Sequence, residues 1–269
     1  MREALAAAGI ESPEREAQLL VEAGTGRVWT ELIAGPGEIE TAQEQRTLDL
    51  TRRRTLGEPL QYVTGVAGFR DLDVAVGPGV FIPRPETEQV VDRALAHLPR
   101  GGIAVDLGTG SGAIALAIAQ ERPDAEVWAT EVAPGALWWA KKNVADLNSD
   151  VHLVSGDLFV ELPSSLRGDV DVTVSNPPYV RHAEAEGLPE VVKDHEPEMS
   201  LYAGGDGLDV VRRIASGARE WLRQGGWLVL EIGATQGDQA GALVEELGYL
   251  EVSVGLDLAG RERIVEARC

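Results

Sequence analysis

An amide and an aromatic ring stand close together in the segment Asn176-Pro177-Pro178-Tyr179. The apolar run before it, residues 170–175, is typical of a buried strand, and two adjacent prolines end strand pairing and stiffen the turn. The Asn176 side-chain oxygen and the Pro177 carbonyl can then accept two N–H bonds, while the Tyr179 ring packs on the bound group. The segment therefore predicts a binding site for a planar amino group. The alternative is a proline-rich turn with a buried tyrosine.

A glycine-rich loop forms a second candidate site, Asp106-Leu107-Gly108-Thr109-Gly110-Ser111-Gly112. It follows an apolar run and opens a helix, so its backbone can approach a ligand closely and helical N–H groups point toward it. Glu131 ends the next strand, where its carboxylate could bind two ribose hydroxyls. These residues predict a nucleoside cofactor without choosing which one, because Gly108-x-Gly110-x-x-Ala113 also fits the dinucleotide fingerprint. A purely structural glycine turn is a further alternative.

Two features favour S-adenosylmethionine over NAD. Glycines at every second position leave an open cradle for an amino-acid tail, whose ammonium Asp106 could face. After a third strand, Asp157 can accept a hydrogen bond from an adenine amino group, and Leu158 can lie against the ring. The alternative for Asp157 is a cap in a loop.

The chain from residue 103 onward alternates strand and helix patterns, which predicts a seven-stranded, mostly parallel, doubly wound α/β sheet with an antiparallel finish. The strands are expected at 103–107, 127–131, 151–155, 170–175, 226–232, 250–255 and 264–267, and the helices at 111–121, 134–147, 208–223 and about 235–247. In such a sheet the fourth strand lies beside the first, so the Asn176 segment faces the glycine loop.

The first 60 residues carry only helical patterns and predict a small helical bundle for partner recognition, or merely for stabilising the sheet. Ser12-Pro13 indicates a helix start, Thr41 to Glu44 fits a capping box, and Gly35-Pro36-Gly37 indicates a loop. Residues 61–85 are expected to form a hairpin and linker, with one strand containing Tyr62 to Gly65 and Phe69 and another at 72–76. Residues 86–269, opening with a helix from Glu86 toward His97, then form the predicted catalytic domain.

Composition narrows the function classes. The formal charge of −20 opposes generic nucleic-acid binding, and the one dense basic cluster, residues 52–54, is typical of a solvated helix face. No apolar run approaches about 18 residues, so no membrane span is expected, and the N-terminus lacks a signal-peptide core. One cysteine, Cys269, fits a reducing cytoplasm. One cysteine and four scattered histidines offer no metal-ligand spacing, so no metal is predicted. We expect a monomer.

The motifs together resemble one family. They are Glu58-Pro59-Leu60-Gln61-Tyr62-Val63-Thr64-Gly65, Phe69, Ile82-Pro83-Arg84-Pro85-Glu86-Thr87-Glu88, the glycine loop at 106–112 and Asn176-Pro177-Pro178-Tyr179. In this order they look like the peptide chain release factor glutamine methyltransferases, over nearly the whole chain. The segment 82–88 is the most specific, since related ribosomal-protein glutamine methyltransferases carry Pro-Arg-Ser-Pro there. Adenine and guanine methyltransferases share only the tetrapeptide and the glycine loop.

The resemblance implies methylation of the glutamine side-chain amide in the Gly-Gly-Gln motif of bacterial-type release factors, with S-adenosylmethionine. It implies cofactor contacts from Gly108, Thr109, Gly110, Ser111, Gly112, Glu131, Leu158 and Asn176. Asp106 and Asp157, described above, complete the predicted cofactor-binding residues. It also implies that residues 176–179 bind the glutamine, with Asn176, Pro177 and Tyr179 as the catalytic residues. Arg84 and Thr87 would lie near the cofactor or its lid, or simply form a rigid connector.

Two departures from the family pattern are visible: Glu131 stands where aspartate is commoner, and Leu158 where some relatives have an aromatic residue. No strong base is needed, because a nitrogen that has just been methylated is very acidic. His182 and His195 are accordingly expected to be loop residues. The remaining alternatives are a nucleic-acid amino-methyltransferase, an NAD-dependent oxidoreductase and a non-enzymatic scaffold.

Overall fold

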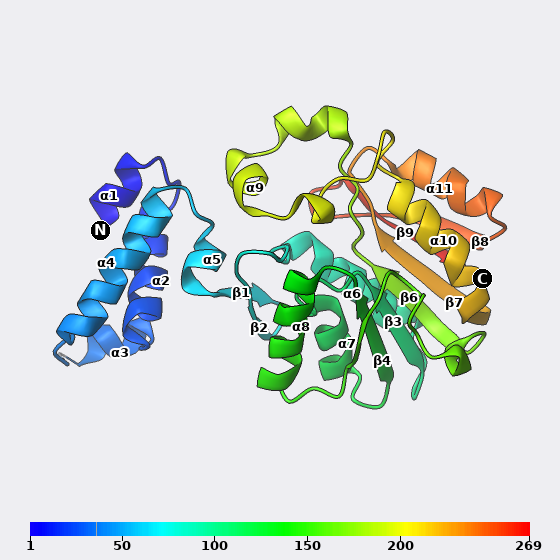
Figure 1. The fold of residues 1–269 in the computed structure, drawn as a ribbon, viewed down its shortest axis with the longest axis horizontal. Helices are drawn as coiled ribbons and strands as arrows, with labels where there is room; N and C mark the ends of the chain where they lie inside the picture. The colour runs from blue at the N-terminus through cyan, green and yellow to red at the C-terminus, as the bar shows by residue number, and fades with distance from the viewer. Residues whose placement is uncertain (36) are drawn as a thin grey trace.

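A computed structural model describes residues 1–35 and 37–269 of the chain. The predicted loop at 35–37 therefore lies partly outside the described residues. Figure 1 shows a group of helices at the N-terminus, a short hairpin, and a large sheet covered by helices on both faces. Within the described ranges, no helix is both long and apolar enough to cross a bilayer.

The N-terminal helices pack around a few fully buried side chains. They are α1 (Arg2–Ala7), α2 (Pro13–Thr25), α3 (Trp29–Ala34), α4 (Thr41–Thr55) and α5 (Leu60–Thr64). Leu5, Leu20 and Val63 form their core. The basic cluster at 52–54 is only partly solvated, because Arg54 pairs with Glu16 of α2 at 2.6 Å and Arg53 with Glu58.

Two local predictions in this region are wrong. Helix α4 is capped one residue earlier than expected: the Glu40 backbone N–H donates to the Gln43 side chain at 3.1 Å, and Thr41 is already helical. Residues 60–64 form α5 rather than a strand, beginning after Pro59 and closed by Gly65 at φ +82°. The strand propensity of Tyr62 and Val63 is overridden because both side chains are buried in helical geometry, and the Tyr62 hydroxyl donates to the Val80 carbonyl.

The predicted hairpin itself is present but shorter. It consists of β1 (Val66–Phe69) and β2 (Leu72–Ala75), which pair antiparallel. Alternate residues face inward, so Ala67, Phe69, Leu72 and Val74 are buried. The hairpin packs into the core on one side of the main sheet and leads into the linker that ends at the 3₁₀ turn η1 (Pro85–Thr87).

The predicted fold class is confirmed. The strands of the main sheet lie in the order β5-β4-β3-β6-β7-β9-β8. They are β3 (Ile103–Leu107), β4 (Glu126–Glu131), β5 (His152–Ser155), β6 (Val170–Ser175), β7 (Leu222–Glu231), β8 (Leu250–Leu256) and β9 (Glu262–Arg268). The first five in this order are parallel, and β9 pairs antiparallel with β7 and β8.

Helices cover both faces of this sheet. One buried cluster packs β1, β2, α6 (Glu88–His97), α7 (Ala113–Glu121) and α8 (Pro134–Asp146) against it, and another packs α10 (Asp209–Trp221) and α11 (Gly237–Glu246) against the opposite face. The neighbouring strands β3 and β6 align Asp106 with Val174. Their carboxyl ends therefore lie side by side, which brings the two candidate motifs to one edge.

A segment between β6 and α10 carries structure that was not predicted. Residues 181–200 contain η3 (His182–Gly187), α9 (Glu190–His195) and η4 (Glu198–Ser200). A bridge closes the base of this segment: the Val180 N–H donates to the Leu201 carbonyl at 2.9 Å, and the Ala203 N–H donates to the Val180 carbonyl at 3.0 Å. We call residues 181–200 the lid, because they arch over the carboxyl edge of the sheet (Figure 1).

Candidate active site

A cavity of about 410 Å³ lies at the carboxyl edge of the sheet, between the glycine loop, the linker and the lid. This volume is within the usual range for small-molecule sites. Eight of the predicted site residues for the cofactor line it: Gly108, Thr109, Gly110, Ser111, Glu131, Asp157, Leu158 and Asn176. Pro197, Met199 and Ser200 of the lid contribute another wall.

The glycine loop keeps its shape through left-handed backbone geometry. Gly108 and Gly110 have φ values of +66° and +62°, which a residue with a side chain rarely adopts. Two hydrogen bonds to the next strand hold the loop: Thr109 N–H to the Thr130 carbonyl at 2.9 Å, and Gly110 N–H to Glu131 Oε2 at 2.9 Å. A Cβ at either glycine would meet open space, so the loop leaves room beside it.

Asp106 lies beneath the loop rather than in the wall of the cavity. Its Oδ2 accepts from the Thr109 hydroxyl at 2.5 Å and from the Ala115 N–H at 3.2 Å, whereas its Oδ1 is buried without a partner among the described residues. Burial raises the pKa of Asp106 to about 7, against the lowering effect of those two donors. Gly112 is likewise absent from the wall and instead caps the start of α7.

Glu131 joins the loop to the next helix. Its Oε2 accepts from Gly110 and its Oε1 accepts from the Ala133 N–H at 2.7 Å. Burial raises the pKa of Glu131, and these backbone donors oppose that rise. Each carboxylate oxygen retains a lone pair that can accept a further bond, so the predicted grip on two hydroxyls is compatible with this arrangement.

Leu158 and Asp157 form the far end of the cavity, after β5. Leu158 has φ +54°, an unusual conformation for a large side chain, and such strain concentrates at functional sites. Asp157 is also paired within the protein, because its Oδ2 accepts from Arg213 of α10 at 2.7 Å. Arg213 also lines the cavity and was not predicted.

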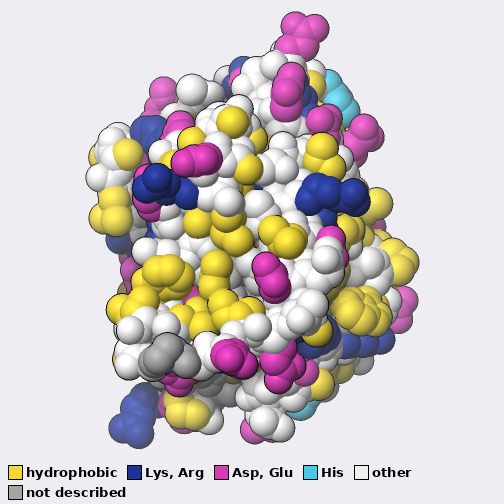
Figure 2. Space-filling view, turned by 90° about the vertical axis from the view of Figure 1, so that its left-hand side faces the viewer, with side chains coloured by type: hydrophobic (Ala, Val, Ile, Leu, Met, Phe, Trp, Pro, Cys, Tyr) yellow, Lys and Arg dark blue, Asp and Glu magenta, His cyan; other side chains and the backbone are white. Residues whose placement is uncertain are grey.

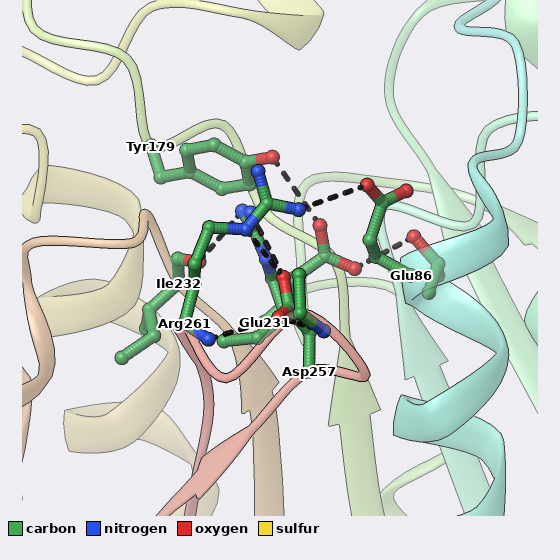
Figure 3. A network of polar contacts seen from close by, with 9 residues as sticks. Glu86, Tyr179, Glu231, Ile232, Asp257 and Arg261 are labelled. Carbon is green, nitrogen blue, oxygen red and sulfur yellow. Dashed lines mark hydrogen bonds and ion pairs between the residues drawn. The ribbon is translucent and has the colours of Figure 1, made fainter.

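Asn176 opens the tetrapeptide and is held by residues from two other elements. Its Nδ2 donates to the Thr87 hydroxyl at 3.1 Å, and that hydroxyl donates to Glu231 Oε2 at 2.6 Å. The Tyr179 hydroxyl donates to the other carboxylate oxygen of Glu231 at 3.3 Å. Figure 3 shows Tyr179 pointing at Glu231, with Glu86 and Arg261 paired beside them.

Glu231 ends β7 and is 1% exposed. Burial raises its pKa to about 7, against the lowering effects of the Thr87 hydroxyl, Arg263 and Tyr179. Burial also raises the pKa of the Tyr179 phenol, and the nearby Glu231 charge adds to the rise. The phenol is therefore a neutral donor at physiological pH.

The prolines of the tetrapeptide occupy different positions. Pro178 lines the cavity beside Asn176, whereas Pro177 is buried and Tyr179 is half-buried. Neither Pro177 nor Tyr179 belongs to the cavity wall, so their catalytic roles stay predictions. The linker segment matters more than expected: Pro83 and Thr87 line the same cavity.

The lid is tied to the linker by a partly buried ion pair. Arg84 pairs with Glu196, whose side chain is only 2% exposed, and the Arg84 guanidinium lies 4.9 Å from the centre of the Phe81 ring. Burial raises the pKa of Glu196, and Arg84 opposes that rise. His182 and His195 are not loop residues as expected, because His182 begins η3 and His195 ends α9 of the lid; neither lines the cavity. Over residues 1–35 and 37–269, no three histidine, cysteine or acidic side chains group as a metal site would require.

Glu231 is the main residue that the sequence patterns did not single out. Its signal was present, since Glu231 is the last residue but one of the apolar run 226–232, as Asp106 is in the strand 103–107, and Glu131 ends the strand 127–131. Three acidic residues at strand ends therefore converge on this edge of the sheet, and the pattern identified only two of them.

Comparison with known proteins agrees with this geometry. Residues 72–194 match the family described as Methyltransferase small domain, and residues 1–65 match PrmC N-terminal domain. A methyltransferase structure from Pyrococcus furiosus superimposes with a TM-score of 0.54 at 20% identity, covering 85% of this chain and 98% of that one. At this identity the likeness concerns the fold alone.

Closer relatives are known by sequence. The release factor glutamine methyltransferase of Bifidobacterium longum is 41% identical, over 97% of this chain and 94% of that protein. The protein of the same name from Streptomyces coelicolor is 42% identical, over 98% of this chain and 94% of its own length. With this identity over nearly its full length, the chain belongs to the release factor glutamine methyltransferase family.

Proposed function

We propose that this protein transfers a methyl group from S-adenosylmethionine to the side-chain amide nitrogen of the glutamine in the Gly-Gly-Gln motif of peptide chain release factors. The observation that carries the proposal is the convergence of Asn176 and the glycine loop on one cavity, from the neighbouring strands β6 and β3. One motif suits a planar amino group and the other a nucleoside cofactor.

The residues of the cavity fit S-adenosylmethionine. Beneath the glycine loop and outside the cavity wall, Asp106 Oδ1 is a buried acceptor without a partner among the described residues, which suits the ammonium of a ligand tail that reaches beneath the loop. Glu131 can accept from ribose hydroxyls, and the space beside Gly108 and Gly110 can receive the amino-acid tail. Leu158 offers an aliphatic surface to the adenine. When bound, this cofactor supplies a methyl group activated by the sulfonium charge.

The tetrapeptide would then hold the acceptor. Asn176 Oδ1 and the Pro177 carbonyl accept the two amide N–H bonds, which orients the nitrogen and stabilises positive charge growing on it. The nitrogen bonds to the methyl carbon as the carbon–sulfur bond breaks, and the nitrogen then loses a proton to solvent. Positioning for in-line displacement can contribute roughly 7–11 kcal/mol at the limit, so no general base is required.

A folded protein substrate would use a second surface. We infer that the helical region 1–60 recognises the partner, next to a hairpin and linker at 61–85 and a catalytic domain at 86–269. Figure 2 shows hydrophobic side chains among charged ones on the side of the molecule where these helices lie. Within the helical region, Ile33, Leu48 and Leu56 are exposed. The charge of −20 suits a basic partner rather than nucleic acid. We further infer a monomer acting in the cytoplasm, where release factors work.

A labelling experiment distinguishes the substrate classes. Purified protein and methyl-labelled S-adenosylmethionine would be incubated with a release factor, with total RNA and with duplex DNA in separate reactions. We expect label in the release factor alone. Label in RNA or DNA but not in the release factor would instead support a nucleic-acid amino-methyltransferase and overturn the proposal.

A further inference from the structure

A chain of three polar side chains runs from the cavity into the protein. Asn176 lines the cavity, Thr87 is 3% exposed, and Glu231 is 1% exposed. The contacts are Asn176 Nδ2 to Thr87 Oγ1 at 3.1 Å and Thr87 Oγ1 to Glu231 Oε2 at 2.6 Å. These residues come from the β6 end, the linker and the β7 end, so no local turn explains their meeting.

The hydrogen-bond direction along this chain is determined by the carboxylate. An ionised carboxylate only accepts, so the Thr87 hydroxyl must donate its single proton to Glu231. The Thr87 oxygen can then only accept from Asn176, which turns the Asn176 NH2 group toward Thr87. The remaining atom of that amide, Oδ1, is left to accept from a ligand in the cavity.

The second oxygen of Glu231 accepts from the Tyr179 hydroxyl at 3.3 Å. One carboxylate therefore holds both ends of the tetrapeptide: the amide of Asn176 through Thr87, and the ring of Tyr179 directly. A buried acidic group of this kind is costly unless its partners are fixed. Here the partners are the Thr87 and Tyr179 hydroxyls, and through them the carboxylate holds Asn176 and Tyr179, which are both predicted to bind the substrate.

We propose that Glu231 is a positioning residue which, through Thr87, makes Asn176 present its oxygen rather than its NH2 group to the acceptor nitrogen. The inference rests on the proposed function, since only an acceptor that donates N–H bonds needs an oxygen there. Protonation of Glu231 adds a donor and releases the Thr87 hydroxyl to donate to Asn176 Oδ1. The Asn176 side-chain amide can then flip, so that its NH2 group rather than its oxygen faces the NH2 group of the substrate.

The charges around Glu231 determine where this reversal occurs. Arg263 of β9 stabilises the carboxylate, whereas Glu86 of η1 opposes it. Glu86 is itself paired with Arg261 at 3.4 Å (Figure 3), and Asp257 pairs with Arg261 and Arg263. The charges of Arg84 and Arg263 lower the pKa of the Tyr179 phenol. With the pKa of Glu231 raised to about 7, the oxygen-presenting state is lost as the pH falls below neutrality.

The first test is the pH profile of kcat with a release factor substrate for the wild type, Glu231→Gln, Thr87→Val and Thr87→Ser. The wild-type kcat should rise to a plateau through about pH 7. In Glu231→Gln and Thr87→Val, kcat should fall at least tenfold and should no longer rise with pH, while the affinity for S-adenosylhomocysteine should be unchanged. Thr87→Ser keeps the hydroxyl, so its kcat and its pH dependence should match those of the wild type. Glu86→Gln is the charge control: its side chain takes no part in the hydrogen bonds among Asn176, Thr87, Glu231 and Tyr179, but its charge raises the pKa of Glu231. This variant should therefore keep the rising limb of the profile and move it to lower pH. A Glu231→Gln enzyme with kcat within twofold of wild type, or with the limb intact, would overturn the proposal.

The second test needs no methyl transfer, so it still applies if release factors prove not to be the substrate. The side-chain amide resonance of Asn176, identified by its loss in Asn176→Ala, would be followed by ¹⁵N NMR across pH 5–9. It should shift with a midpoint near pH 7 in the wild type and not titrate in Glu231→Gln or Thr87→Val. A resonance that is indifferent to pH in the wild type, or that titrates alike in Glu231→Gln, contradicts the proposed coupling.

Discussion

At the scale of single residues, Asn176 is the residue on which acceptor binding depends most, because its Nδ2 is held by Thr87 and its Oδ1 is left to the cavity. Replacing Asn176 with alanine removes an acceptor from the substrate and should lower kcat by about 100-fold, as for the loss of one preorganised hydrogen bond. Single-turnover kinetics would measure the loss. Asn148→Ala, at an exposed position outside the cavity, should leave kcat unchanged; equal losses in both variants would refute the assigned role.

Glu131 provides a second prediction at this scale. Its carboxylate holds the Gly110 and Ala133 N–H groups and faces the cavity, so Glu131→Ala should loosen the loop and remove the ribose acceptor together. With hydrogen bonds to charged groups contributing about 1.5–3 kcal/mol each, affinity for S-adenosylhomocysteine should fall by at least tenfold. Calorimetry would measure it. Leu147→Ala serves as a control outside the cavity, and a Glu131→Ala protein that binds as well as this control would remove Glu131 from the site.

At the scale of elements, the structure joins the lid to the linker through Arg84 and Glu196. Arg84→Ala leaves a buried carboxylate without its cation. Because Arg84 is 31% exposed, the cost should be roughly 2 kcal/mol, below that of a fully buried pair. Limited proteolysis should then cut faster within residues 181–200. Arg167→Ala breaks an exposed pair with Glu220 and should cost less than about 1 kcal/mol without changing lid cleavage. Equal cleavage of the lid in both variants would show that the ion pair does not secure it.

Element positions show what sequence patterns can and cannot predict. The strands at 103–107 and 170–175 were predicted with their observed bounds, because each is a short apolar run with clear flanking breakers. Residues 62–64 were assigned to a strand because their propensity is local, whereas their helix depends on burial against distant residues such as Val80. The lid was missed because a polar segment without periodicity carries no such pattern.

In the candidate site, too, some residues were predicted from the sequence and others are revealed only by the structure. The glycine loop, Glu131 and the tetrapeptide were recognised because their chemistry lies in contiguous residues or at strand ends. Asn176 and Thr87 meet across 89 positions of sequence, and Thr87 and Glu231 meet across 144. No spacing rule predicts a contact of that kind, so only the three-dimensional arrangement reveals that Glu231 belongs to the site.

At the scale of the whole molecule, two buried acidic residues make the free energy of unfolding depend on pH. The pKa values of Asp106 and Glu231 are about 7 in the folded protein, above the ordinary values of 3.8 and 4.5. The folded state thus holds more protons than the unfolded state between about pH 4 and 7, and the free energy of unfolding falls as the pH rises through that window. The ionisation of Glu231 is also the event expected to orient the Asn176 oxygen toward the acceptor.

Denaturant unfolding at pH 5 and pH 8 tests this balance in the ligand-free protein. The free energy of unfolding of the wild type should be lower at pH 8 than at pH 5. In Glu231→Gln this difference should be smaller by on the order of 3 kcal/mol, since a shift of one pKa unit corresponds to about 1.4 kcal/mol. Glu86→Gln, on the surface nearby, should change the fall far less. Wild-type stability that is constant or rises between these pH values would contradict the assignment of raised pKa values to the buried acids.

Tandem mass spectrometry of a release factor is the most direct test of which residue this protein methylates. After incubation with this protein and S-adenosylmethionine, the release factor should gain one methyl group, located on the glutamine of its Gly-Gly-Gln motif. A release factor with that glutamine replaced by alanine should gain none. A methyl group on any other residue, or the same gain in the replaced release factor, would contradict the account.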